Sequence, residues 1–291
     1  MISRNQLAGG LLALPLLAAT TILVLIPALV TFFFAFTDFD GLGQIRLNGF
    51  ANFSKLWNDL LFWTSLKNSF YIAAIGVPLR ITLALFLALL LAPERTGVAT
   101  ARTAVFLPSV VPDISYALLW LWMFNPLYGP LGLAISALGL PGEQLLLTPW
   151  GARFSLIFMS LFQIGEVYIV LLAARRELPH ELYELCTLEG TSAFWIFRRV
   201  TLPLLMPTIV FLTARDVAWS LQSTFVPSLV ITKGGPNYAT LFLPLYIYQN
   251  GFEYLKFGYA SAMTTVMFVL TGLMIYIQIR VLRFRKGLFD L

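Results

Sequence analysis

The sequence predicts an all-α polytopic membrane protein with six transmembrane helices, and its composition and length carry that prediction. Hydrophobic residues make up 59% of the 291 residues and charged residues only 11%, whereas soluble globular chains carry about 25% charged residues. A spanning helix needs about 20 apolar residues. The chain therefore has room for six spans and no soluble catalytic domain, and we expect a single transmembrane domain over residues 1–291.

Six apolar runs follow one another along the chain, at residues 7–36, 69–92, 103–124, 151–174, 204–231 and 259–279. The first run is longer than the apolar region of a secretory signal, which is about 7–15 residues, so we expect a retained helix. Five prolines fall inside the runs, namely Pro15, Pro27, Pro78, Pro108 and Pro112. Membrane helices tolerate such prolines because neighbouring groups satisfy the carbonyls that they free.

The distribution of the basic residues predicts the orientation of these helices in the membrane. With the N-terminus in the cytoplasm, eleven of the 19 Lys and Arg fall in inner segments and six in outer ones, while Arg80 and Arg215 lie within spans. Positive charge concentrates in the cytoplasmic loops of membrane proteins. We therefore expect both termini in the cytoplasm. The net charge of +5 follows from this topology and does not indicate a nucleic-acid partner.

The outer loops, 37–68, 125–150 and 232–258, are rich in Gly, Pro and aromatic residues. Such aromatics fit an interfacial belt or a docking surface for a soluble partner. A single cysteine, Cys186, excludes an intrachain disulfide, and a single histidine, His180, excludes a His-rich metal site. The chain holds no GxxxxGK[ST], HExxH, CxxC or GxSxG motif, so we expect neither an ATPase nor a hydrolase.

The inner loop at residues 175–203 predicts two short helices bent at a glycine. Apolar residues recur at i, i+3 and i+4 in its first half, and Gly190 is placed to end that helix. A second short helix is expected over residues 193–200. Glu181 and Glu184 lie on the stripe opposite the apolar face, so the loop exposes acid while its apolar face rests against another surface.

Ionisable residues within the spans are functional candidates, since each costs roughly 2.5–3.5 kcal/mol to insert near the bilayer centre. Hydroxyls, a carboxylate and an indole share one face of the fifth helix, and this combination suits a carbohydrate. The alternative is a structural network in which arginine neutralises the acids. The expected pathway residues are Glu166, Tyr168, Asp216, Trp219, Ser220, Gln222 and Ser223, and the expected charge network adds Arg80 and Arg215.

The inner loop also resembles a known family. Its pattern, Glu184-Leu-Cys-x3-Gly190-x9-Val200-x-Leu202-Pro203, is similar to the EAA loop of ATP-binding-cassette importer permeases, E-A-A-x3-G-x9-I-x-L-P. Leu185, Cys186 and Val200 depart from that pattern. The segments NGFANFSKLW, LPSVVPDISYALLWLWMFNPLYGPLG and KGGPNYAT extend the resemblance along the chain. Together they resemble the sugar-importer permeases of the maltose and glycerol-phosphate type.

This resemblance implies a type I importer permease fold in a bacterial or archaeal cell membrane. It implies a second permease subunit, two ATPase subunits that hold ATP and Mg, and an extracytoplasmic sugar-binding protein, with no cofactor or catalysis on this chain. It also implies that the loop couples the permease to the ATPase, rather than resting as a solvated loop on its own domain. The expected coupling residues are Glu181, Glu184, Leu185, Gly190, Leu202 and Pro203.

Two other functions compete with an importer permease. A proton-coupled secondary transporter would use Glu166 and Asp216 as a relay, but such carriers ordinarily show paired, inverted halves, and the sequence shows no convincing repeat. A membrane-embedded enzyme would need a catalytic constellation, and none converges here. The importer permease is therefore the expected function, with the identity of the sugar left open.

Overall fold

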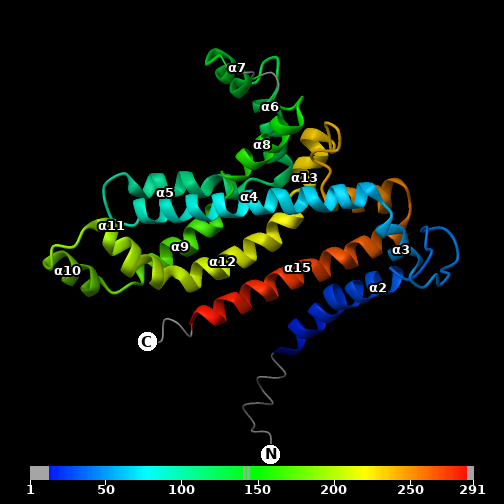
Figure 1. Ribbon diagram of the computed structural model, residues 1–291, viewed down its shortest axis with the longest axis horizontal. Coiled ribbons are helices and arrows are strands. Elements are labelled where there is room, and N and C mark those ends of the chain that lie inside the picture. The colour runs from blue at the N-terminus through cyan, green and yellow to red at the C-terminus, as the bar shows by residue number, and fades with distance from the viewer. Residues whose placement is uncertain (1–12, 140–141, 143–144, 287–291) are drawn as a thin grey trace, which may run out of the picture. The chain divides into compact units, whose positions relative to one another are not determined.

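The structure is a computed structural model that describes residues 13–139, 142 and 145–286 (Figure 1). Within these ranges the chain is helical, and an isolated bridge between Thr37 and Leu47 is the only β pairing. Four helices are long and apolar enough to cross a membrane, and two bent pairs raise the number to six if each pair is one span. The predicted all-α fold is confirmed. Residues 7–12 of the first predicted run lie outside the described residues.

The chain divides into two compact units, Met1–Phe62 with Tyr246–Leu270, and Trp63–Leu245 with Thr271–Leu291. The helices of the first unit are η1 (Thr21–Leu25), α2 (Ile26–Phe34), α3 (Ala51–Trp57), η6 (Gln249–Glu253) and the first part of α15 (Phe257–Lys286). In Figure 1, α2 lies beside this part of α15, where the rings of Phe32 and Phe268 meet edge to face at 5.4 Å.

Asp59 accepts hydrogen bonds from several residues of the first unit. Its carboxylate accepts hydrogen bonds from the Tyr246 and Tyr259 hydroxyls, both at 2.6 Å, and from the backbone N–H groups of Leu61 and Phe62 at 2.9 and 3.2 Å. The last two bonds cap α4 (Leu60–Leu90). The helix therefore begins at Leu60 and not at residue 69, because the cap lies before the apolar run that predicted it.

The second unit contains most of α4 and the last part of α15, and several described helices lie wholly within it. They are α5 (Val98–Phe106), η2 (Leu107–Val110), α6 (Asp113–Met123), α7 (Pro130–Ala137), α8 (Pro149–Ser160), α9 (Gly165–Arg176), α10 (His180–Leu188), α11 (Ala193–Ile196), η4 (Phe197–Thr201), α12 (Leu202–Ser223), α13 (Phe225–Pro227) and η5 (Ser228–Thr232). The short α14 (Leu243–Tyr248) crosses from this unit to the first. A buried aromatic core centres on Tyr116, Trp120 and Phe124 of the α6 region.

The third and fourth predicted spans are not continuous helices. The segments Val98–Val110 and Asp113–Met123 meet at 102°, and Pro149–Ser160 and Gly165–Arg176 meet at 44°. Pro112 lacks an N–H, and it holds Val111 in an extended conformation, which ends the first segment. At the second break the backbone N–H of Gly165 donates to the Ser109 hydroxyl at 2.9 Å. The two breaks therefore lie against each other within the second unit.

The second short helix predicted for the inner loop, residues 193–200, is not separate from the next span. Helical structure continues from Ala193 to Ser223 and, after a turn at Thr224, to Thr232. Ser192 caps it by accepting a hydrogen bond from the Trp195 N–H at 3.3 Å. The wide turn η4 ends two residues before Pro203, which lacks the N–H of a regular helix bond. The loop thus consists of one separate helix, α10, followed by the segment Ala193–Thr201 that leads directly into α12 and is called the foot of α12 below.

Candidate functional site

A buried ion pair joins α4 to α12 in the second unit. The Arg80 Nε donates to Asp216 Oδ2 at 3.0 Å, and Nη2 lies 2.9 Å from the same oxygen, with the two side chains 3% and 2% exposed. Arg80 Nη1 also donates to the Ser160 hydroxyl at 3.1 Å. A Cβ at Gly76 would lie 2.9 Å from Nη1, so the glycine one turn away makes room for the guanidinium.

A small cavity of about 30 Å³ lies beside this pair. Trp219, Ser220 and Ser223 of α12 line it, as the helical periodicity of the sequence predicted, and the Arg80 guanidinium lies 5.1 Å from the centre of a Trp219 ring. Pockets for small molecules measure about 300–1,000 Å³, at least roughly ten times this volume. A sugar ring does not fit in the cavity in this conformation.

Three polar residues of the cavity were not predicted from the sequence. Ser160 and Gln163 flank the break between α8 and α9, and Thr224 follows the predicted stripe directly. The Thr224 hydroxyl is buried and makes no hydrogen bond within the described part of the chain. The signal for Ser160 and Gln163 was the polar interruption of the fourth apolar run, which hydropathy averaging over the run conceals.

The other pathway candidates lie apart from the cavity. Glu166 of α9 forms an ion pair with Arg215 of α12, with the two side chains 60% and 40% exposed, and Figure 1 shows these two helices side by side. Tyr168 is fully buried, and its hydroxyl finds no partner among the described residues. Gln222 is exposed. Each intramembrane acid on the predicted list is thus paired with an arginine of another helix.

The helix α10 forms the first half of the predicted inner loop, and its acidic stripe is exposed as expected. None of its residues is buried, and Glu184 and Leu185 are 70% and 60% exposed. Gly190 adopts φ +71°, in the left-handed region that favours glycine, and this conformation ends the helix. Glu181 is also exposed, so the loop presents two carboxylates and an apolar side chain that this chain does not cover.

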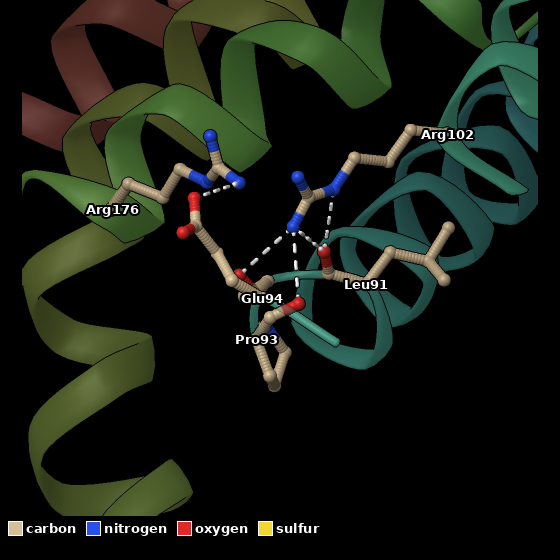
Figure 2. Close-up of polar contacts among 6 residues, drawn as sticks. Leu91, Pro93, Glu94, Arg102 and Arg176 are labelled. Atoms are coloured by element: carbon tan, nitrogen blue, oxygen red, sulfur yellow. Dashed lines mark hydrogen bonds and ion pairs between the residues drawn. The ribbon is translucent and has the colours of Figure 1, made fainter. Parts of the chain in front are cut away.

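Two arginines contact the segment that joins α4 to α5 (Figure 2). Arg102 donates to the carbonyls of Leu91 at 2.7 and 2.9 Å and of Pro93 at 3.1 Å, which satisfies carbonyls left free at the end of α4. Arg176, at the end of α9, lies 3.4 Å from the Glu94 carboxylate. The sequence did not predict this cluster, because its partners come from distant segments.

The loop that contains Gly-Gly-Pro is fixed at the opposite end of α4. The Asn68 side chain donates to the backbone carbonyls of Tyr238 and Leu241 at 2.7 and 3.1 Å. Arg153 of α8 donates to the Asn68 amide oxygen at 2.9 Å and to the Ala239 carbonyl at 3.0 Å. These bonds hold the loop in a defined shape, while the Tyr238 ring stays 55% exposed.

Broken membrane helices, intramembrane ion pairs and a protruding acidic helix define a multi-pass membrane transport protein. A family model described as the binding-protein-dependent transport system inner membrane component matches residues 80–287. The chain belongs to this family. It is the membrane permease of an ATP-binding-cassette importer, in which ATP hydrolysis lies on separate subunits, so the chain is not itself an enzyme.

Curated relatives cover almost the whole chain. The probable ABC transporter permease protein YesP of Bacillus subtilis is 33% identical over 280 residues, which cover 94% of this chain and 89% of the relative. The lactose transport system permease protein LacF of Rhizobium radiobacter is 30% identical over 284 residues, with 96% and 95% coverage. The resemblance to sugar-importer permeases is thus confirmed.

A solved structure has the same fold. It is the crystal structure of a bacterial alginate ABC transporter in complex with a periplasmic protein that holds an alginate pentasaccharide, and it matches with a TM-score of 0.82 and 22% identity over 95% of this chain and 94% of that chain. The predicted importer permease fold and the multi-pass membrane location are confirmed. A proton-coupled carrier is not favoured.

Proposed function

We propose that this chain is one of two unlike permease subunits of a sugar importer. The importer has two ATPase subunits, which bind ATP and Mg, and one of them docks on α10. An extracytoplasmic binding protein delivers the sugar. The whole of residues 1–291 acts as one permease domain, with residues 175–203 as its coupling loop. The observation that carries the proposal is α10 itself, an amphipathic helix with no buried residue in a chain of the importer permease family.

The coupling role rests on chemistry that α10 leaves unsatisfied. Glu181 and Glu184 offer carboxylates to a basic cleft, and Leu185 offers an apolar contact, while Leu202 and Pro203 begin the helix that receives the movement. Gly190 supplies the turn between the docking helix and that receiving helix. An ATPase with a basic, partly apolar cleft is the partner that this surface fits.

The cargo side of the proposal rests on the cavity. Trp219 offers an apolar ring face, and Ser220, Ser223, Gln163 and the unpaired Thr224 hydroxyl offer hydrogen bonds, which are the groups that a sugar requires. Because the cavity is too small for a sugar ring, the helices must separate to admit one. We propose that Asp216 and Glu166 hold the helices together through their arginines rather than shuttle protons.

The coupling role is tested by charge reversal at Glu184. In the complex of both permeases, the ATPase and the binding protein, Glu184→Lys should abolish uptake and sugar-stimulated ATP hydrolysis. Gly190→Val should do the same, because a β-branched residue strains a turn with φ +71°. Glu253→Lys makes the same charge change at an exposed position outside the loop and should leave ATPase association intact. Normal uptake by the Glu184→Lys complex would refute the docking role. A panel of labelled sugars identifies the cargo.

The cytoplasmic position of the loop needs its own test. In a Cys186→Ser background, cysteine is introduced at Ser54 or at Glu189, which are both exposed. An impermeant thiol reagent added to intact cells should label the Ser54→Cys protein, and it should label the Glu189→Cys protein only after the membrane is opened. The reverse pattern would overturn the orientation and the coupling role with it.

A further inference from the structure

Tyr183 is the residue that attaches α10 to the rest of the second unit. Its hydroxyl lies 3.0 Å from the Thr201 hydroxyl, and its ring centre lies 4.1 Å from the guanidinium carbon of Arg175. Among the described residues, the other side-chain hydrogen bonds and ion pairs of α10 stay within residues 180–191. The covalent connections at its two ends also join α10 to the unit, and one of these contains Gly190.

The two partners of Tyr183 belong to different membrane helices. Thr201 is buried, at 4% exposure, and directly precedes α12. Arg175 lies in the last turn of α9. The ring of Tyr183 therefore contacts the foot of α9, and its hydroxyl contacts the foot of α12. These are the two helices that carry Glu166 and Asp216.

The helix α12 connects this foot to the cavity. It is assigned as one helix from Leu202 to Ser223, with Pro207 inside it. Trp219 lies eighteen residues beyond Thr201, or about 27 Å along the axis at 1.5 Å per residue. A helix of this kind transmits a displacement of its end. A loop that ends in glycine instead absorbs a displacement, because its backbone dihedrals change at little cost.

We infer that Tyr183 is a positioning residue that makes α10, the foot of α9 and the foot of α12 move as one body. Without its two contacts, a displacement of α10 by the ATPase is absorbed at residues 189–192, and the cavity does not open. This inference rests on the proposed docking of the ATPase on α10. It adds the element that carries the movement from the docking surface to the cavity.

The test removes the bond from each end. Tyr183→Phe deletes the hydroxyl and keeps the ring over Arg175, and Thr201→Val deletes the other hydroxyl with little change in volume. Thr213→Val is the matched control, because the Thr213 hydroxyl bonds only to the Ile209 carbonyl of its own helix, at 2.7 Å. The complete reconstituted complex is assayed for the number of sugar molecules moved per ATP hydrolysed.

Tyr183→Phe should keep ATP hydrolysis and complex assembly near the wild-type level. It should lower the number of sugars moved per ATP by about three- to tenfold, which is the change in an equilibrium constant that the loss of one hydrogen bond causes. Thr201→Val should cause the same loss, and the double variant should be no worse than either single variant. Thr213→Val should match the wild type. If Tyr183→Phe fails to assemble, Thr201→Val decides the question from the other end.

An unchanged ratio of sugar to ATP in both single variants, or losses that add in the double variant, would overturn the inference. Spin labels at Thr187→Cys and Leu204→Cys in a Cys186→Ser background measure the attachment directly. The distance distribution should be narrow with Tyr183 and broad with Tyr183→Phe, and equal widths would also overturn the inference. If Glu184→Lys transports normally, the proposed docking fails; if Glu184→Lys is inactive while Tyr183→Phe is normal, only this inference fails.

Discussion

The guanidinium of Arg80 lies 2.9 Å from the carboxylate of Asp216, although the two residues are 136 positions apart in the chain. Neither side chain is more than 3% exposed. A pair this deeply buried is costly to break, because the remaining partner keeps its charge and loses its counter-ion. Of the two roles expected for Asp216, which do not exclude each other, this pair supports the structural role that we propose.

Replacing Asp216 by Asn should therefore act on folding before it acts on transport. The substitution keeps volume but leaves Arg80 unpaired, at a cost of about 3–5 kcal/mol, so the yield of folded protein in the membrane should fall severely. Glu253→Gln is the control, since Glu253 is exposed and lies outside the predicted spans, and its loss should cost about 0.5 kcal/mol or less. Equal yields for the two variants, measured by size-exclusion chromatography in detergent, would contradict the network.

Removing the indole of Trp219 should act on transport instead. Trp219→Ala should leave the complex assembled and should lower uptake to a degree that differs among sugars, because sugars differ in the apolar face that they offer to an aromatic ring. Uptake and assembly are measured separately. Wild-type transport of every sugar by this variant would remove Trp219 from the cargo path. Trp122→Ala, an exposed tryptophan of α6 outside the cavity, is the matched control.

The contact between Gly165 and Ser109 should tolerate no side chain. A Cβ at Gly165 would lie 2.5 Å from the Ser109 hydroxyl and 2.9 Å from the Phe106 ring. Gly165→Ala should thus destabilise the protein by about 1–3 kcal/mol, seen as a lower thermal midpoint in detergent. Gly272→Ala is the control, since nothing lies within 4 Å of a Cβ there. Partial recovery by Ser109→Ala in the Gly165→Ala background would confirm that the clash is the cause.

Asp59 should make the stability of the first unit depend on pH in the acid range. Burial raises the pKa of Asp59, but hydrogen bonds from Tyr246, Tyr259 and the N–H groups of Phe62 and Leu61 outweigh it, so the pKa lies below its usual range. A carboxyl with a lowered pKa stabilises the fold above its unfolded pKa, about 3.9. That stabilisation is lost as the pH falls through the lower, folded value.

The thermal midpoint, measured from pH 7 down to pH 3, should therefore fall less steeply for Asp59→Asn than for the wild type, since Asn keeps a cap for α4 but carries no charge. Asp59→Ala should lose about 1–3 kcal/mol at pH 7 as well, because it removes the cap and the acceptor of both tyrosines. Parallel pH profiles for the wild type and Asp59→Asn would show that this carboxylate does not contribute.

The sequence predicted the structural features that depend only on residues close together along one helix. Period-3.6 spacing placed Trp219, Ser220 and Ser223 on one face, and the left-handed preference of glycine placed the end of α10 at Gly190. The choice of Arg80 rather than Arg215 as the partner of Asp216 depends on the register between α4 and α12. No local spacing encodes that register, so the sequence left both pairings open.

Hydropathy also concealed the two breaks. An average over an apolar run does not register that Pro112 ends one helix, or that Ser160 and Gln163 flank a bend. The early start of α4 was missed for a related reason, since its cap, Asp59, lies in a segment too polar to be counted with the span. The carbonyl contacts of Arg102 were beyond reach because they depend on the packing of α5 against the end of α4.

The bend between η2 and α6 affects how far water can reach into the permease. Together α5 and η2 rise only about 20 Å, less than the hydrocarbon thickness of about 30 Å, so a span made of this bent pair turns while still inside the bilayer. Irregular backbone at that depth persists only when protein covers it or water reaches it. Amides near Val111 should therefore exchange with deuterium faster than those of Ala84 and Ala88 in the interior of α4, and the exchange should mark how far solvent penetrates the permease.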